Sequence, residues 1–245
     1  VFFRLPVTGD NPLDWKWERL PAWPGASRAF AVGAGQSNGV TNSFYMFSGR
    51  NIQNGKVIEI FLDGFVFDPS EKKWEAISSR KFPVMGGTVF AMGASSIVFP
   101  SGADGRLMKK ELAIKKKIAE AKNQVVRDSL QNRLTNHLNH HPGFGNRIFI
   151  FNTVTGEIYD FGKSPVSGQV TTSALKWNES IFIPSGEKHP GVRTPVTLKI
   201  DIRKNTRHFN FLDVIVIISY FLILALMGWY FSRRQKSTND YFKGG

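Results

Sequence analysis

Three similar apolar runs in this sequence each end in Ser-Gly, and their repetition constrains the fold more than any other feature. The runs are FYMFSG (44–49), SIVFPSG (96–102) and SIFIPSG (180–186). A second kind of run places turn residues between two apolar segments, at FVFDPSEKKWEAI (65–77) and FIFNTVTGEIYDF (149–161), with WERLP (17–21) as the end of an earlier copy. Short β-rich runs separated by Asp, Asn, Pro, Ser and Gly predict antiparallel strands joined by hairpins.

The spacing of these runs indicates a repeat of roughly 50 residues that has taken an insertion. Gly102 and Gly186 are 84 residues apart, whereas Gly49 and Gly102 are only 53 apart. The corresponding phenylalanines of the second run are also 84 residues apart. The difference of 31 residues is close to the length of the basic segment 106–141, which we therefore interpret as an insertion into one repeat.

A repeat of this length, with a strand that ends in glycine and a later turn followed by tryptophan, resembles the kelch repeat of β-propellers. In propellers each repeat forms a four-stranded blade, and roughly four to eight blades close a ring. The chain departs from the pattern by carrying Ser-Gly where kelch repeats usually have paired glycines. We expect a mainly β fold: a partial kelch propeller of two to three blades in 1–105 and 142–202, with the missing blades in the N-terminal half of a longer chain.

The insertion 106–141 is expected to be helical. It is rich in helix-forming residues and contains no Pro or Gly. Its apolar residues recur at helical spacing but slip in phase midway, which predicts one broken helix or two helices laid over a propeller face. The segment contributes +6 to the net charge of +13. A nucleic-acid-binding arm is the alternative, but interleaved aromatic residues are missing, so we expect no nucleic-acid partner.

The end of the insertion contains three histidines, His137, His140 and His141, which invite a metal-site interpretation because His at i and i+3 share a helix face. No Asp or Glu follows nearby, and the chain has no Cys. We therefore expect no metal site here. The lack of cysteine also excludes disulfides and a thiol nucleophile, so any catalysis must use oxygen and nitrogen groups.

The tail contains an uncharged apolar segment long enough to cross a membrane. Residues 214–231 carry no charge, and extension to Phe211 gives about the 20 residues that a bilayer core requires. Basic residues follow directly, as is typical of a cytoplasmic flank, although basic residues also precede the segment. A buried core helix is the alternative, but few such helices are apolar on every face. We predict a linker at 203–210, a transmembrane helix at 211–232 in contact with membrane lipid, and a cytoplasmic loop at 233–245.

The loop SGEKHPGVRTP (185–195) holds the candidate functional residues. Glu187 and Arg193 flank a Pro-Gly turn, so we expect both side chains to enter one pocket at a mouth of the propeller channel. A carboxylate there can transfer protons, and a guanidinium can bind an anion through two hydrogen bonds. An exposed surface loop with no chemical role is the alternative that composition alone favours.

The segment SGEKHPGVRTPVTLKIDI (185–202), with the insertion and FNTVTGEIYDFGKSP (151–165) before it, resembles the N-acetylneuraminate epimerase family of bacterial kelch propellers. WERLPAWPGASRAFAV (17–32) and FDPSEKKWEAIS (67–78) resemble preceding blades of that family. The resemblance implies that Glu187 is the catalytic acid/base and that Arg193 and Arg28 bind substrate. It further implies an isomerase that interconverts the anomers of an anionic sugar such as N-acetylneuraminate, with no metal or organic cofactor.

The tail FLDVIVIISYFLILALMGWYFSRRQKSTNDYFKGG (211–245), with its motif STNDYF (237–242), resembles the start of the sodium:solute symporter family. This implies a fragment of a fusion in the bacterial inner membrane. A periplasmic mutarotase-like propeller would precede a symporter, whose absent remainder would bind sodium ion. Two alternatives remain open. The propeller is a non-catalytic ligand-binding module of the transporter, or it is degenerate and transport is the whole function.

Overall fold

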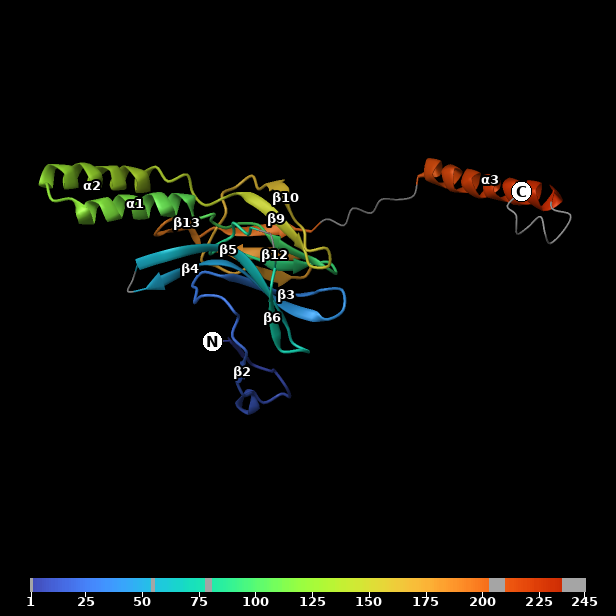
Figure 1. Ribbon diagram of the computed structural model, residues 1–245, viewed down its shortest axis with the longest axis horizontal. Coiled ribbons are helices and arrows are strands. Elements are labelled where there is room, and N and C mark those ends of the chain that lie inside the picture. Colours follow the sequence, from blue (N-terminus) through green and yellow to red (C-terminus); the bar gives the residue numbers. More distant parts are fainter. Residues whose placement is uncertain (1, 54–55, 78–80, 203–209, 235–245) are drawn as a thin grey trace. The chain divides into compact units, whose positions relative to one another are not determined.

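The computed structural model describes residues 2–53, 56–77, 81–202 and 210–234 (Figure 1). The chain divides into two compact units, Val1–Ile202 and Arg203–Gly245. The described strands all belong to the first unit, and every strand pair in it is antiparallel. The mainly β architecture is therefore confirmed.

Two sheets have four strands and a third has three, which agrees with the expected two to three blades. The first sheet, in the order β3-β4-β5-β6, comprises β3 (Val32–Ser37), β4 (Asn42–Gln53), β5 (Lys56–Asp68) and β6 (Lys73–Ala76). The second, in the order β10-β9-β8-β7, comprises β7 (Phe90–Met92), β8 (Ser96–Phe99), β9 (Arg147–Asn152) and β10 (Ile158–Lys163). The third, in the order β11-β12-β15, comprises β11 (Leu175–Trp177), β12 (Ser180–Pro184) and β15 (Thr197–Asp201).

Two short hairpins complete the strands: β1 (Phe2–Arg4) pairs with β2 (Glu18–Leu20), and β13 (Glu187–His189) pairs with β14 (Val192–Arg193). A single 3-10 turn, η1 (Pro12–Asp14), lies between β1 and β2. The Ser-Gly runs all occupy the second strand of a sheet or the residues directly after it, in β4, β8 and β12. The sequence repeat therefore corresponds to strands that occupy the same place in successive sheets.

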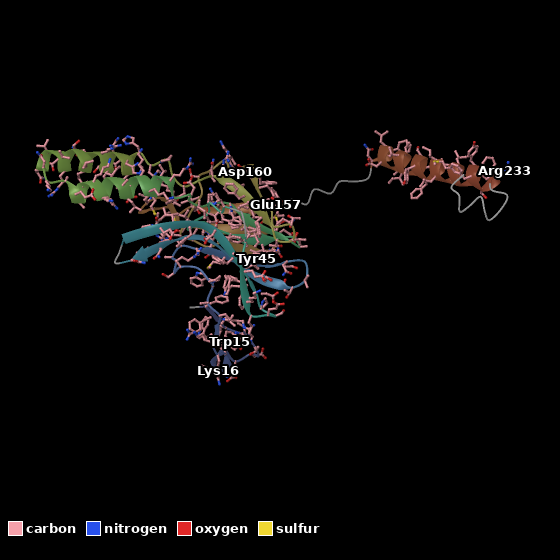
Figure 2. The ribbon with its side chains drawn as sticks, in the orientation of Figure 1. Trp15, Lys16, Tyr45, Glu157, Asp160 and Arg233 are labelled. Atoms are coloured by element: carbon pink, nitrogen blue, oxygen red, sulfur yellow. The ribbon has the colours of Figure 1, made fainter. Side chains whose placement is uncertain are left out.

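Aromatic side chains form the core between the first two sheets. Phe47, Phe82, Phe99 and Phe151 are each at most 2% exposed, and the rings of Phe47 and Phe99 meet edge-to-face with centroids 5.0 Å apart. A second cluster, which includes Ile150, Ile181 and Ile183, packs the second sheet against the third. Figure 2 shows Tyr45 among these packed sheets. Burial of each such side chain contributes about 1.5–3 kcal/mol, so the sheets are held together by their facing apolar sides.

The Ser-Gly turns keep a backbone conformation that glycine usually provides. Ser48 and Ser185 have φ angles of 60° and 55°, and the glycines after them have φ angles of 115° and 105°. A Cβ on Gly49 would lie 2.9 Å from the carbonyl oxygen of Ala29, and one on Gly186 would lie 2.8 Å from that of Val170. In two of the three Ser-Gly turns the serine thus adopts the left-handed conformation, whereas Ser101 does not, and the glycine is required by a close approach of two backbones.

The insertion forms two helices, α1 (Arg106–Glu120) and α2 (Gln124–Asn139), within the connection from β8 to β9. The break between them coincides with the phase slip in the sequence, and the Asn123 side chain caps α2 by accepting a hydrogen bond from the Val125 N–H at 2.8 Å. Ile114 and Leu134 are the buried residues of the pair, and the lysines at 115–117 are exposed. Of the two helices, only the beginning of α1 lines a cavity, and the expectation that the helices lie over a propeller face stays a prediction.

The second unit contains α3 (Phe211–Arg234). Its segment Phe211–Arg233 contains an 18-residue stretch with a mean hydropathy of 2.5 and is long and apolar enough to cross a membrane. At its start, Asp213 Oδ2 accepts a hydrogen bond from the Asn210 N–H at 2.9 Å, a favourable place for a carboxylate. At its end, the guanidinium of Arg233, labelled in Figure 2, lies 4.2 Å from the centre of the Trp229 ring. Membrane insertion stays a prediction, and the motif at 237–242 lies outside the described residues.

Candidate functional site

One position of the repeat recurs beside the same cavity in all three sheets. The residue that follows each Ser-Gly turn is Arg50, Ala103 or Glu187. Each forms an isolated antiparallel bridge, in the pairs Ala29–Arg50, Met85–Ala103 and Val170–Glu187. Arg50, Ala103 and Glu187 all line a cavity of about 1100 Å³. Each of the three repeats therefore supplies one side chain to this cavity.

Hydrogen bonds between neighbouring sheets hold the wall of the cavity. Phe30, Gly86 and Thr171 occupy one equivalent position, next to the bridged residues, and have φ angles of 59°, 64° and 56°. The Thr171 N–H donates to the Gly86 carbonyl at 2.8 Å, and the Gly86 N–H donates to the Phe30 carbonyl at 2.8 Å. A left-handed conformation costs a non-glycine residue about 1–2 kcal/mol. Such strain concentrates at functional sites, which supports a functional role for this wall.

Glu187, the predicted acid/base, is half-buried at the cavity lining and begins β13. Its backbone is fixed from both sides, because its N–H donates to the Val170 carbonyl at 2.9 Å and its own carbonyl accepts from the Val170 N–H at 3.1 Å. The Oε2 atom has a long hydrogen bond of 3.4 Å from the Gly191 N–H. The backbone is therefore rigid, while the carboxylate stays available to a ligand in the cavity.

Arg193 lies directly opposite Glu187 in the β13–β14 hairpin, since the Cα atoms of the two residues pair in the strand register. The turn between them contains Gly191 with a φ angle of 73°. Arg193 is exposed and does not belong to the cavity lining. The structure thus brings the two predicted residues together as cross-strand neighbours, and it places only Glu187 at the cavity. The role of Arg193 in substrate binding stays a prediction.

Arg28, the other predicted substrate ligand, is buried against the first sheet. Its side chain is 1% exposed, and Nη1 and Nη2 donate to the two carboxylate oxygens of Asp63 at 2.6 and 3.1 Å. Nη1 also donates to the Ser48 carbonyl at 3.1 Å, and the guanidinium lies 4.4 Å from the centre of the Phe61 ring. Arg28 is not among the residues that line the cavity. These contacts give it a structural function, and substrate binding by Arg28 stays a prediction.

Arg50 is a cavity residue that the sequence interpretation missed. Its guanidinium lies 4.2 Å from the centre of the Phe30 ring, and Nη1 donates to the Sδ of Met108 at 3.2 Å. Burial lowers the pKa of Arg50, and the charges of Glu111 and Glu187 partly oppose this effect. The signal was present in the repeat, because Arg50 follows SG at 48–49 as Glu187 follows SG at 185–186.

The helical insertion contributes a second side of the cavity, through the beginning of α1 and the segment after α2. His141, in that segment, is 8% exposed, and its Nδ1 accepts a hydrogen bond from the Gly143 N–H at 3.1 Å. Burial lowers the pKa of His141, and the nearby His189 and His137 lower it further, against a smaller opposite effect of Glu111. Among the described residues, no group of three or more His, Asp or Glu is placed to hold a metal ion.

The cavity combines the carboxylate of Glu187, which can exchange a proton, with the guanidinium of Arg50, which can bind an anion. Both belong to one cavity, whose other charged lining residues are Asp104, Arg106, Lys110, Glu111, Arg147 and Lys163. Such a site suits an anionic, hydroxyl-bearing ligand of small size.

Comparisons with known proteins agree with this description. The family model for N-acetylneuraminate epimerase matches residues 2–218. The N-acetylneuraminate epimerase of Salmonella arizonae is 24% identical over 186 residues, which are 74% of this chain and 46% of that protein. N-acetylneuraminate epimerase 1 of Escherichia coli O6:H1 is 22% identical over 187 residues, 75% of this chain and 48% of that protein.

Among solved structures, the one titled "Structure of YjhT" superposes with a TM-score of 0.66 at 19% identity, covering 83% of this chain and 56% of that one. The shared fold is consistent with the sheet repeat described above. The chain spans about half the length of the curated relatives that it matches. Since the family model covers most of the sequence, the chain belongs to the N-acetylneuraminate epimerase family.

Proposed function

We propose that this chain supplies the acid/base residue, Glu187, of a sialic acid mutarotase, an isomerase that interconverts the anomers of N-acetylneuraminate. The observation that carries the proposal is the position of Glu187, with its backbone held by Val170 and its carboxylate at the lining of a cavity of about 1100 Å³. Family membership and the names of the relatives support the choice of sugar.

The reaction requires only proton transfers. The Glu187 carboxylate accepts the proton of the anomeric hydroxyl, the bond from the anomeric carbon to the ring oxygen breaks, and the protonated Glu187 gives that proton to the ring oxygen, which yields the open-chain ketone. Rotation about the bond next to the carbonyl carbon presents its other face. The reverse steps then close the ring to the other anomer and return the proton to its starting place.

Arg193 has a supporting role in this proposal. It lies opposite Glu187 across the hairpin and, as an exposed guanidinium beside a carboxylate, helps to orient that carboxylate and to attract an anionic sugar. We propose no metal or organic cofactor for the step, because the proton transfers above need neither.

The test uses Glu187→Gln in the intact polypeptide. Exchange between the two anomers of N-acetylneuraminate is followed by NMR saturation transfer, and we expect the variant to lower the enzyme-dependent rate to the uncatalysed one while sugar binding persists. Glu111→Gln is the matched control, because Glu111 lines the same cavity but its carboxylate accepts a hydrogen bond from Lys115 at 2.6 Å. Unchanged exchange in Glu187→Gln would refute the assignment.

A second candidate function is a non-catalytic ligand-binding module. The exposed hairpin with Arg193 favours it, because a cation at the surface can capture an anion without chemistry. In that case Glu187→Gln would leave both binding and transport unchanged, and only removal of the Arg193 cation would weaken binding. The same NMR measurement therefore separates the two functions.

We further propose that α3 is the first membrane helix of a sodium:solute symporter fused to this propeller, in a bacterial inner membrane with the propeller on the periplasmic side. The apolar length of Phe211–Arg233 supports this proposal. The missing helices would hold the sodium ion and the transported solute, and the missing blades would close the propeller. The test is the intact mass of the native polypeptide extracted from membranes, which we expect to be several-fold above that of 245 residues. A mass equal to that of these residues would refute the fusion.

A further inference from the structure

Arg50 is a partly buried cation that forms no ion pair with a carboxylate among the described residues. Its Nε atom is buried and lacks a hydrogen-bond partner, and Nη1 has only the thioether sulfur of Met108, a weak acceptor. Arg28, whose Nε is likewise buried without a partner, provides the contrast, because its Nη atoms donate two hydrogen bonds to the carboxylate of Asp63. The two arginines thus differ in whether the protein itself supplies the anion.

A partly buried guanidinium with no hydrogen-bonded anion is unfavourable, because the charge has lost part of its water, and the charges of Glu111 and Glu187 offset only part of that loss. Arginine does not relieve this cost by losing its proton. The Phe30 ring, whose centre lies 4.2 Å from the guanidinium carbon, partly compensates the lost hydration of the charge and holds the guanidinium plane in place. The arrangement is therefore preorganised for an anion that arrives from the cavity.

The other cations of the cavity lining fit this task less well. Arg106 is 88% exposed at its side chain and is paired with Asp104, and Arg147 is 59% exposed and paired with Asp160 at 2.7 Å. Lys110 and Lys163 are exposed, and an ammonium group cannot form the two parallel hydrogen bonds that a planar carboxylate accepts from a guanidinium.

We infer that Arg50 binds the carboxylate of the substrate, so that the cavity selects sugar acids over neutral sugars. This inference rests on the proposed function, and it adds the residue that holds the sugar ring of the substrate in position. In a 2-keto sugar acid the carboxylate and the anomeric hydroxyl are attached to the same carbon. A cation that anchors the carboxylate must therefore lie on the same cavity as the acid/base, and the repeat places Arg50 and Glu187 at equivalent positions of two sheets on that cavity.

The test compares N-acetylneuraminate with its methyl ester, which keeps the ring but lacks the negative charge. Binding of each to the intact polypeptide is measured by calorimetric titration. We expect Arg50→Gln to weaken binding of the acid by about 10- to 100-fold, the range for a lost charge-assisted hydrogen-bond pair, and to change binding of the ester by less than about threefold. Arg106→Gln is the matched control on the same cavity and should change neither affinity by more than about threefold.

Arg50→Lys keeps the charge without the fork and should give an intermediate affinity for the acid. Since no carboxylate among the described residues is hydrogen-bonded to Arg50, Arg50→Gln should unfold at about the same temperature as the original protein, which separates lost binding from lost folding. The inference is overturned if Arg50→Gln and Arg50→Lys both retain the original preference for acid over ester, or if Arg193→Gln removes that preference instead.

Failure of the inference and failure of the proposed function give different results. If Glu187→Gln leaves anomer exchange unchanged while Arg50→Gln loses the preference for the acid, the mutarotase assignment is wrong and the carboxylate site stands. If Glu187→Gln stops exchange while Arg50→Gln keeps the preference, the mutarotase assignment stands and the carboxylate site is wrong.

Discussion

The guanidinium of Arg28 and the carboxylate of Asp63 form an ion pair with two hydrogen bonds in which only one partner is shielded from water. The Arg28 side chain is 1% exposed, whereas that of Asp63 is 45% exposed. Asp63→Asn would leave the buried cation without its anion. We expect it to lower the free energy of unfolding by about 1–3 kcal/mol, as measured by urea denaturation.

The matched control is Glu18→Gln. Glu18 pairs with Arg4 at 2.5 Å, but both side chains are 48% exposed, so water already solvates each charge. Its removal should change the free energy of unfolding by less than about 1 kcal/mol. Equal losses in the two variants would show that the burial of Arg28 adds nothing to the strength of the pair.

Gly87 is predicted to be intolerant of a methyl group although its φ angle is not in the left-handed region. A Cβ there would lie 2.0 Å from the carbonyl oxygen of Ser101, on a neighbouring backbone that has little room to move. Gly87→Ala should lower the free energy of unfolding by about 3 kcal/mol. In β3, a Cβ on Gly35 would meet only the Ser43 carbonyl at 3.9 Å, so Gly35→Ala should be neutral or stabilising by up to about 1 kcal/mol. A similar loss in both variants would contradict the steric argument.

The sheets were predictable because their signals are local. The side chains of Asp68 and Asn152 accept hydrogen bonds from N–H groups two or three residues later in their turns. The Ser-Gly turns recur once in each sequence repeat. The break between the two insertion helices was also predictable, because Asn123 and the phase slip lie at the same place. Each of these features depends on neighbours in sequence.

The site was predictable only in part, because side-chain placement depends on contacts between distant segments. Glu187 lies at the cavity as the sequence indicated, but Arg28 is covered by Phe61 and paired with Asp63, 35 residues later. Arg193 lies on the exposed side of a hairpin whose bulge no composition signal predicts. Arg50 was missed because it lies within the long strand β4 and belongs to no recognised motif. Comparison of the residue after each Ser-Gly turn would have identified it.

His141 predicts a pH dependence of stability. Burial, followed by His189 and His137, lowers its pKa below the ordinary histidine value, so the unfolded chain binds the proton more readily than the folded one. The stability contributed by neutral His141 is therefore present above the ordinary pKa of about 6.5 and is lost as the pH falls below it. Protonation would also remove the Nδ1 acceptor of the Gly143 N–H.

The measurement is the free energy of unfolding between about pH 7.5 and pH 5.5, compared with that of His141→Asn. Asparagine retains an acceptor for Gly143 but does not titrate, so the variant should lose less stability over this range than the original protein. His140→Asn is the control, since His140 is exposed and should leave the dependence unchanged. Identical pH dependence in His141→Asn and the original protein would contradict the prediction.

We expect the protein to be less stable with threonine at position 171 than with glycine there. Thr171 has a φ angle of 56°, a conformation that costs a β-branched residue about 1–2 kcal/mol, and its Oγ1 atom is buried without a hydrogen-bond partner. The equivalent residue of the second sheet is already glycine, Gly86. Thr171→Gly should therefore raise the free energy of unfolding by about 1 kcal/mol, even though glycine has more entropy in the unfolded chain.

The control for Thr171→Gly is Thr88→Gly. Thr88 is 1% exposed, its φ angle is not positive, and its hydroxyl forms a hydrogen bond of 3.0 Å with that of Ser101. Here glycine relieves no strain, removes a buried side chain and loses the hydrogen bond of its hydroxyl, so the free energy of unfolding should fall by about 1–3 kcal/mol. Opposite signs for the two threonines are the expected result. A loss of the same size in Thr171→Gly would mean that packing of the Thr171 side chain outweighs its backbone strain, and the left-handed wall of the cavity would then be a product of packing alone.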